Sequence, residues 1–164
     1  MKLNSDTANK LIKNYNAEIA ALLDAESQNS TYSYSASEEP VIPAYSFAET
    51  QTQIHAFQAK IAKLRHAVSV FNSEKVLPEY ACTLDEAIGR MSFLNAEKKR
   101  LYDLLQIPEK QRSRSYGSRE ADITCRNFDA AEVRAAYDKV VQDLMEIQQA
   151  INIANLTETF EVDL

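Results

Sequence analysis

The side chains best suited to chemistry lie in one stretch of the sequence, QRSRSYGSREADITCRNFD, which covers residues 111–129. A guanidinium group binds a phosphate through paired hydrogen bonds, and an aromatic ring stacks on an unpaired base. The stretch is therefore a candidate site for an anion or for single-stranded nucleic acid. Its candidate contact residues are Arg112, Arg114, Tyr116, Arg119 and Arg126. The opposing interpretation is that the same residues only connect two helices.

The charge around this stretch is uneven. Residues 90–119 contain eight basic and three acidic residues, whereas residues 120–164 contain three basic and ten acidic residues. Such asymmetry steers charged partners or pairs subunits head to tail. We expect the acidic helix and the basic loop to face each other within an assembly. The net charge of the whole chain is −6, which argues against general binding of nucleic acid.

No other residues form a pattern with a known chemistry. His55 and His66 lie eleven residues apart, or about 16 Å along a helix, so they cannot share one metal ion. Cys82 and Cys125 lie far apart in the sequence with no histidine nearby, so we expect two reduced thiols. Two isolated glycines cannot build a phosphate-binding loop. We therefore expect no enzyme activity, no catalytic residue, no cofactor and no metal ion.

Four amphipathic segments must position these residues. Between Ile54 and Phe71, apolar residues recur at alternating spacings of three and four, which is the pattern of a coiled-coil seam. Sequence signals for helix starts are two capping boxes, Ser46 with Glu49 and Thr83 with Glu86, and an aspartate cap at Asp129. The predicted helices cover about residues 5–27, 46–72, 83–106 and 129–155.

The composition favours a single all-α domain over residues 1–164. Two glycines and four prolines are too few for the many turns of a β-sandwich or barrel. We expect a four-helix antiparallel coiled-coil-like bundle with long connectors and room for one small β element. Seams of this length also predict a homo-oligomer, because part of a seam can be shared with a second chain.

The connectors are expected to be less regular than the helices. Residues 28–44 are rich in Ser and Tyr and end in two prolines, which predicts a mobile loop. The β character of residues 123–125 favours pairing with residues 75–83 as a small two-stranded cap, within one chain or between subunits according to the topology. The tail, residues 159–164, alternates polar and apolar residues, which fits a short strand, an exchanged arm or a frayed terminus.

Four short motifs carry a resemblance to a known family: RHAVSVFNSE (residues 65–74), TLDEAIGR (83–90), SYGSREADI (115–123) and IQQAINIANLTETF (147–160). They resemble the septicolysin-like family of small bacterial coiled-coil proteins of unknown function. Leu156 stands where that family has a tryptophan. The resemblance implies a helical coiled-coil fold and no catalytic residues. The family name suggests a lytic protein, but no amphipathic hairpin of pore-forming length is present.

The sequence therefore predicts a structural or interaction protein that self-associates through heptad helices and has no catalytic activity. The alternative is an anion- or RNA-binding protein that uses the arginine-rich loop, residues 112–126. No run of about 18 apolar residues is present, so we expect no membrane span. The polar N-terminus lacks the apolar core of a signal peptide, which predicts a cytoplasmic protein. An unknown protein partner stays open, and nucleic acid is disfavoured.

Overall fold

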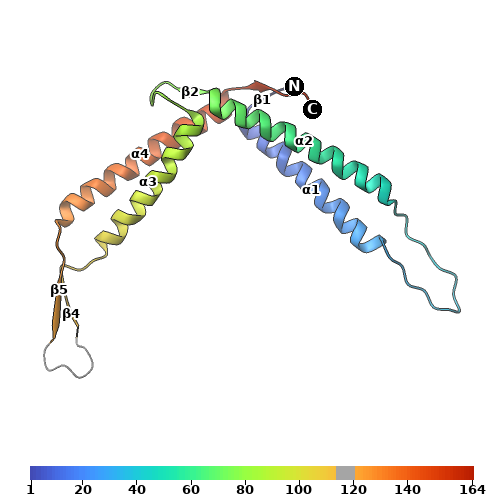
Figure 1. Cartoon of the computed structure of the whole chain (residues 1–164), viewed down its shortest axis with the longest axis horizontal. Helices are drawn as coiled ribbons and strands as arrows, with labels where there is room; N and C mark the ends of the chain where they lie inside the picture. The colour runs from blue at the N-terminus through green and yellow to red at the C-terminus, as the bar shows by residue number, and fades with distance from the viewer. Residues whose placement is uncertain (114–120) are drawn as a thin grey trace. The chain divides into compact units, whose positions relative to one another are not determined.

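The computed structural model describes residues 1–113 and 121–164 and has four helices in these ranges (Figure 1). They are α1 (Ser5–Asn29), α2 (Phe47–Glu74), α3 (Leu84–Leu105) and α4 (Ala130–Thr157). The four predicted helices are confirmed, and their ends differ from the predicted ends by at most two residues. Residues 28–44, predicted as a loop, lie mainly in the connector between α1 and α2.

Short strands in the described residues form three antiparallel pairs rather than the one small β element that we expected. The strands are β1 (Lys2–Leu3), β2 (Val76–Leu77), β3 (Cys82–Thr83), β4 (Lys110–Ser113), β5 (Asp122–Cys125) and β6 (Phe160–Glu161). β2 pairs with β3, and β4 pairs with β5, so the predicted pairing of residues 123–125 with residues 75–83 is wrong. Pairing within one connector closes a shorter loop and therefore costs less chain entropy.

The chain divides into two compact units. Unit 1 comprises Met1–Lys75 and Ile153–Leu164, and unit 2 comprises Val76–Asn152. Unit 1 therefore contains α1, α2 and both chain ends, whereas unit 2 contains α3 and most of α4. The single domain over residues 1–164 and the packing of all four helices into one bundle stay predictions.

In unit 1, α1 and α2 lie side by side and run in opposite directions (Figure 1). Ala8 of α1 and Leu64 of α2 are completely buried in one apolar cluster, which Leu3 and Val162 extend. Burying a leucine side chain contributes about 1.5–3 kcal/mol, so this cluster holds the two helices together. The predicted seam of α2 is the side of the helix that is buried, and its buried residues are Ile54, Ile61 and Leu64.

The two chain ends close unit 1. β1 pairs with β6, so that Leu3 lies opposite Phe160. The amino group of Met1 donates to the carbonyl oxygen of Val162, and the N–H of Val162 donates to the carbonyl oxygen of Met1 at 2.9 Å. Leu3 and Val162 are both 6% exposed. Of the three forms predicted for the tail, the structure therefore has the short strand, paired within the same chain.

In unit 2, α3 and α4 also lie side by side with opposite directions (Figure 1). Leu101 of α3 is buried against Val140 and Leu144 of α4. Partly buried apolar residues of both helices surround this cluster, namely Met91, Leu94, Leu104, Val133 and Tyr137. Each helix therefore packs on the other through one apolar side.

The helix starts differ in quality. Thr83 and Glu86 form a complete capping box, because Thr83 Oγ1 accepts from Glu86 N at 3.3 Å and Glu86 Oε2 accepts from Thr83 N at 2.7 Å. At α2, Ser46 Oγ accepts from Glu49 N at 3.4 Å, which is the first half of the predicted box. Asp129 caps α4 as predicted, since its Oδ1 accepts from the second helical N–H at 2.7 Å. These caps satisfy backbone N–H groups that have no partner inside a helix.

Candidate functional site

The predicted arginine site lies on a β-hairpin of unit 2. β4 and β5 pair with Lys110 opposite Cys125 and Arg112 opposite Ile123. Opposite residues of an antiparallel pair point to the same face of the sheet, and so do residues two apart along a strand. One face of the hairpin therefore presents two cations, Lys110 and Arg112, beside the apolar side chain of Ile123. All four side chains are exposed.

Arg126 lies beyond the end of β5, where its N–H donates to the carbonyl oxygen of Glu109 at 2.9 Å. Its guanidinium lies 5.5 Å from the centre of the Phe128 ring, which is a cation–π contact. Arg126 is half-buried, so less of its side chain is open to a ligand than of the exposed Lys110 and Arg112. Arg114, Tyr116 and Arg119, the other predicted contact residues, lie outside the described residues.

Sequence reasoning missed Lys110. The signal was present, because Lys110 and Arg112 are two residues apart and a strand places such residues on one face. The prediction placed the β character only at residues 123–125, so the partner strand and its lysine were overlooked. Within the described residues, Lys110, Arg112 and Arg126 are the cations that this connector contributes.

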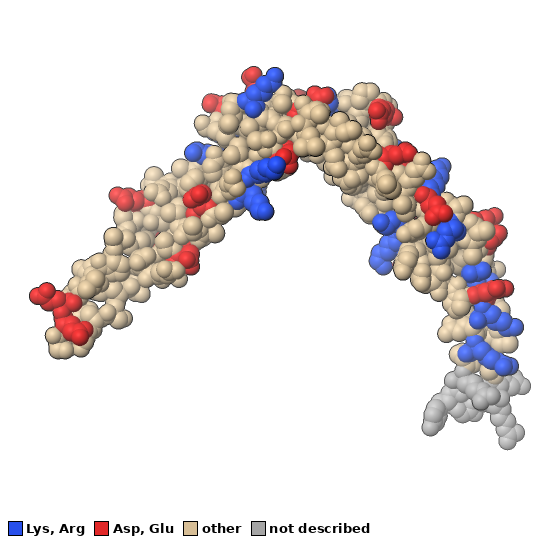
Figure 2. Space-filling model, turned by 180° about the vertical axis from the view of Figure 1, so that it is seen from behind, with Lys and Arg blue, Asp and Glu red and all other residues tan. Residues whose placement is uncertain are grey.

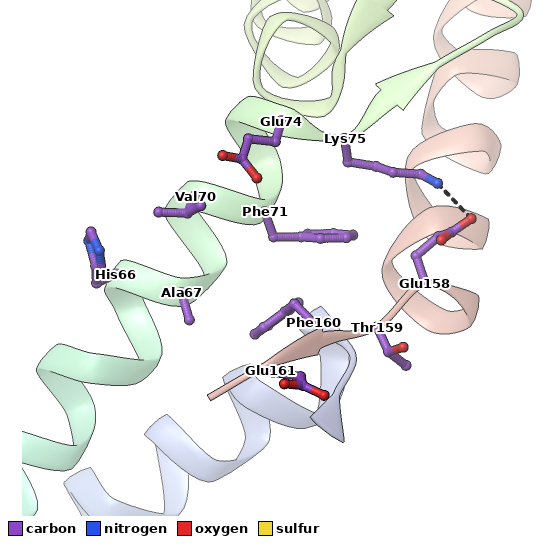
Figure 3. A pocket seen from close by; sticks show the side chains of 10 residues that line it. All are labelled: His66, Ala67, Val70, Phe71, Glu74, Lys75, Glu158, Thr159, Phe160 and Glu161. Atoms are coloured by element: carbon purple, nitrogen blue, oxygen red, sulfur yellow. Dashed lines mark ion pairs between the residues drawn. The ribbon is translucent and has the colours of Figure 1, made fainter. Parts of the chain in front are cut away.

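A second candidate is an open hollow of about 510 Å³ in unit 1, between the last turns of α2 and the tail (Figure 3). The rings of Phe71 and Phe160 point toward each other across it, with centroids 5.1 Å apart. Lys75 Nζ lies 2.7 Å from Glu158 Oε1, and both side chains are partly exposed. The hollow is therefore open to solvent, with an aromatic contact inside it and charged groups at its border.

The charged border of the hollow is mainly acidic. Glu74, Glu158 and Glu161 contribute three carboxylates, and Lys75 neutralises one of them. His66 is exposed and lies on the rim. The arrangement can hold the tail on α2, since Phe160 comes from β6 and Phe71 from α2.

A small polar cluster in unit 2 surrounds a cavity of about 30 Å³. Burial raises the pKa of Tyr80 above its ordinary value of 10.0, and the negative charge of Glu146 raises it further. Arg90, on the same cavity, lowers it. The phenol therefore stays protonated at neutral pH and is a hydrogen-bond donor rather than a base.

The remaining candidate residues do not come together. His55 is exposed, and its Nε2 lies 2.7 Å from the Gln51 amide nitrogen. Cys82 is half-buried and Cys125 exposed, and both are free thiols. Within residues 1–113 and 121–164, no group of three or more His, Cys, Asp or Glu side chains is arranged to hold a metal ion. None of the helices in these ranges is both long enough and apolar enough to cross a membrane.

The comparison with known proteins supports the fold and indicates no activity. No family model matches the chain, and no curated protein matches it at a significant level. A crystal structure described as that of a functionally unknown conserved protein from Corynebacterium diphtheriae is similar, with a TM-score of 0.66 and 17% sequence identity. The match covers 98% of this chain and 100% of that chain. At this identity the likeness establishes a shared fold alone.

Proposed function

We propose that the chain is a structural or interaction protein that self-associates through its helices and has no catalytic activity. The observation that carries the proposal is the incomplete cover of α1. Its apolar stripe contains Ala8, Ile12, Tyr15, Ile19 and Leu22, yet of these only Ala8 is buried. The other four are half-buried although α2 lies along the whole helix.

The physical reason is geometric. A single neighbouring helix covers a narrow seam, whereas a helix in a globular core buries a stripe at least 100° wide. Burial of apolar surface contributes about 25 cal/mol per Å², so binding of a further partner that covers the rest of the stripe is favoured. We assign that partner to a second copy of the chain, and a coiled-coil-like bundle of helices is the expected form of the contact.

Hydrogen exchange of α1 tests the proposal. Amide exchange is measured at about 1 µM and about 100 µM protein, because association follows mass action. We expect the amides between Ile12 and Leu22 to exchange more slowly at the higher concentration. The amides of the connector around Tyr32 are the internal control, and their exchange should slow less than that of the α1 amides. Equal exchange of α1 at both concentrations would contradict self-association through this helix.

Two finer predictions belong to the same proposal. The resemblance to the septicolysin-like family remains a proposal, supported by the four motifs and by a mainly helical fold. The cytoplasmic location is likewise retained as part of the proposal, and cell fractionation with an antibody to the native protein tests it.

A second candidate function is binding of an anion or single-stranded RNA at the β4–β5 hairpin. The observation that favours it is the shared face of Lys110 and Arg112. Each phosphate contact makes affinity fall with salt, so a fluorescent RNA oligomer is titrated at about 50 mM and about 200 mM salt. Replacing Lys110 and Arg112 by alanine should weaken binding and flatten the salt dependence. The matched control replaces Lys10 and Lys13 of α1. Absence of binding at low salt would eliminate this candidate.

A further inference from the structure

The connector of unit 1 exposes an apolar pair that no element of its own unit covers. Val41 is 89% exposed and Ile42 is 66% exposed. Pro40 and Pro43 flank the pair, and Glu38 and Glu39 precede it. We call residues 38–43 the acidic loop segment.

The prolines prepare this segment for binding. Proline fixes its own φ and favours an extended conformation in the residue before it. An extended segment that is already restricted loses less conformational entropy when it docks. The base of the connector is also fixed to α1, because Tyr45 Oη donates to Glu26 Oε2 at 2.9 Å.

Unit 2 carries a groove with complementary properties near the C-terminal end of α3. Its volume is about 430 Å³. The residues that line it are Ala96, Lys99, Arg100, Asp103, Leu104 and Ile107. We call it the α3 groove. Its interior is apolar, Ile107 is 40% exposed, and two cations stand on its rim.

The rim cations are available for a new partner. Lys99 pairs with Asp103 at 3.3 Å and Arg100 with Glu97 at 3.5 Å, and all four side chains are about half exposed or more. Exposed pairs within one helix contribute about 0.5 kcal/mol or less, so exchanging such a partner costs little. A carboxylate that approaches together with an apolar anchor can therefore replace Asp103 or Glu97.

The wider charges of the two regions are opposite. Residues 14–59, which include the acidic loop segment, contain six acidic residues and no Lys or Arg. Residues 98–112, which include most of the α3 groove, contain five basic and two acidic residues. Figure 2 shows acidic groups without basic neighbours at the loop end of the α1–α2 pair, and basic groups in unit 2 next to the undescribed residues. Opposite charges of this kind increase association rates and suppress wrong pairings.

We propose that the acidic loop segment of one copy docks in the α3 groove of a second copy. Val41 and Ile42 enter the apolar groove, while Glu38 and Glu39 face Lys99 and Arg100. The inference rests on the proposed self-association and adds a second contact to the one along α1. Two different surfaces meet, so each copy offers both a segment and a groove, and repetition of the contact gives a ring or an open chain.

Two variants remove the contact from opposite sides. The segment variant combines Val41→Ser with Ile42→Ser and removes the anchor. The groove variant, Ala96→Glu, fills the groove and adds a repelling charge at an exposed helix position. Sedimentation velocity should give an apparent Kd about 100-fold weaker for the segment variant and at least about tenfold weaker for the groove variant. Matched controls are Tyr32→Ser with Tyr34→Ser in the same connector, and Ala135→Glu in α4. Both controls should associate like the native chain.

Mixing the two variants gives the decisive result. The segment variant retains its groove and the groove variant retains its segment. An equimolar mixture should therefore form a complex of twice 18.5 kDa at concentrations at which each variant alone is monomeric. If the native chain associates and both variants associate as tightly as it does, the docking inference is wrong and the proposed function is unaffected. If the native chain is monomeric up to about 100 µM, both fall together.

Discussion

The two units use the same plan for their helices and different plans for everything that joins them. Each unit packs two long antiparallel helices along heptad seams. In unit 1 the connector between these helices is an acidic segment without strands, whereas in unit 2 it contains the basic β4–β5 hairpin. The helices satisfy the same packing requirement. The connectors carry the opposite charges, so we expect recognition to reside there.

The units also differ in how their cores are closed. The β1–β6 pair closes unit 1 and places the tail residue Val162 in the core. Unit 2 depends more on the start of α3, where Leu84 is completely buried and Thr83 forms the capping box. Unit 1 is therefore expected to be sensitive to changes at the chain ends, and unit 2 to changes at a helix cap.

The largest effect is expected from removing the most buried leucine of each unit. Leu64 in unit 1 and Leu84 in unit 2 are both 0% exposed. Replacement of either by alanine should cost about 2–5 kcal/mol of unfolding free energy, because it leaves a cavity. Urea unfolding followed by circular dichroism measures the loss. Leu23→Ala, at a position 49% exposed, is the control and should cost much less.

A smaller loss of stability is expected from a substitution in the tail that closes unit 1. Val162→Ala removes two buried carbon atoms and should cost about 2 kcal/mol. Exchange of the amides in β1 should increase as well, since β6 is their partner. Val76→Ala at 50% exposure is the matched substitution and should cost much less. Equal losses for the two valines would mean that the tail is frayed in solution.

The helix caps should differ between the units. Thr83→Ala breaks a complete capping box and should cost about 1 kcal/mol. Ser46→Ala removes one bond of 3.4 Å and should cost less than half as much. Thermal unfolding of both variants measures the difference. A larger loss of stability for Ser46→Ala than for Thr83→Ala would contradict the stronger cap at α3.

The smallest effect concerns pH. Burial raises the pKa of Tyr45 above its ordinary value of 10.0, and its hydrogen bond to Glu26 and the charge of Glu26 raise it further. The folded state therefore favours the protonated phenol, and this stabilisation is complete below pH 10 and disappears as the pH rises through the folded pKa. The free energy of unfolding should therefore fall more steeply above about pH 10 in the native chain than in Tyr45→Phe. Urea unfolding of the two chains at about pH 9 and about pH 11 measures the difference, and equal losses would contradict the role of the phenol.

Periodicity made the helices predictable, because Ile54, Ile61 and Leu64 repeat at the spacing that a packed helix requires. Thr83 and Asp129 could be predicted as caps since their signals are local. The pairing of β4 with β5 was missed because short strands carry little sequence information about their partners. The contact of Phe71 with Phe160 joins residues far apart in the chain, so no local signal could have predicted the hollow.

The molar mass in solution tests the central claim most directly. Light scattering after size exclusion is measured between about 1 and 100 µM protein, at low and at high salt. We predict a mass above 18.5 kDa that increases with concentration and decreases with added salt. A constant mass of 18.5 kDa under all these conditions would contradict self-association.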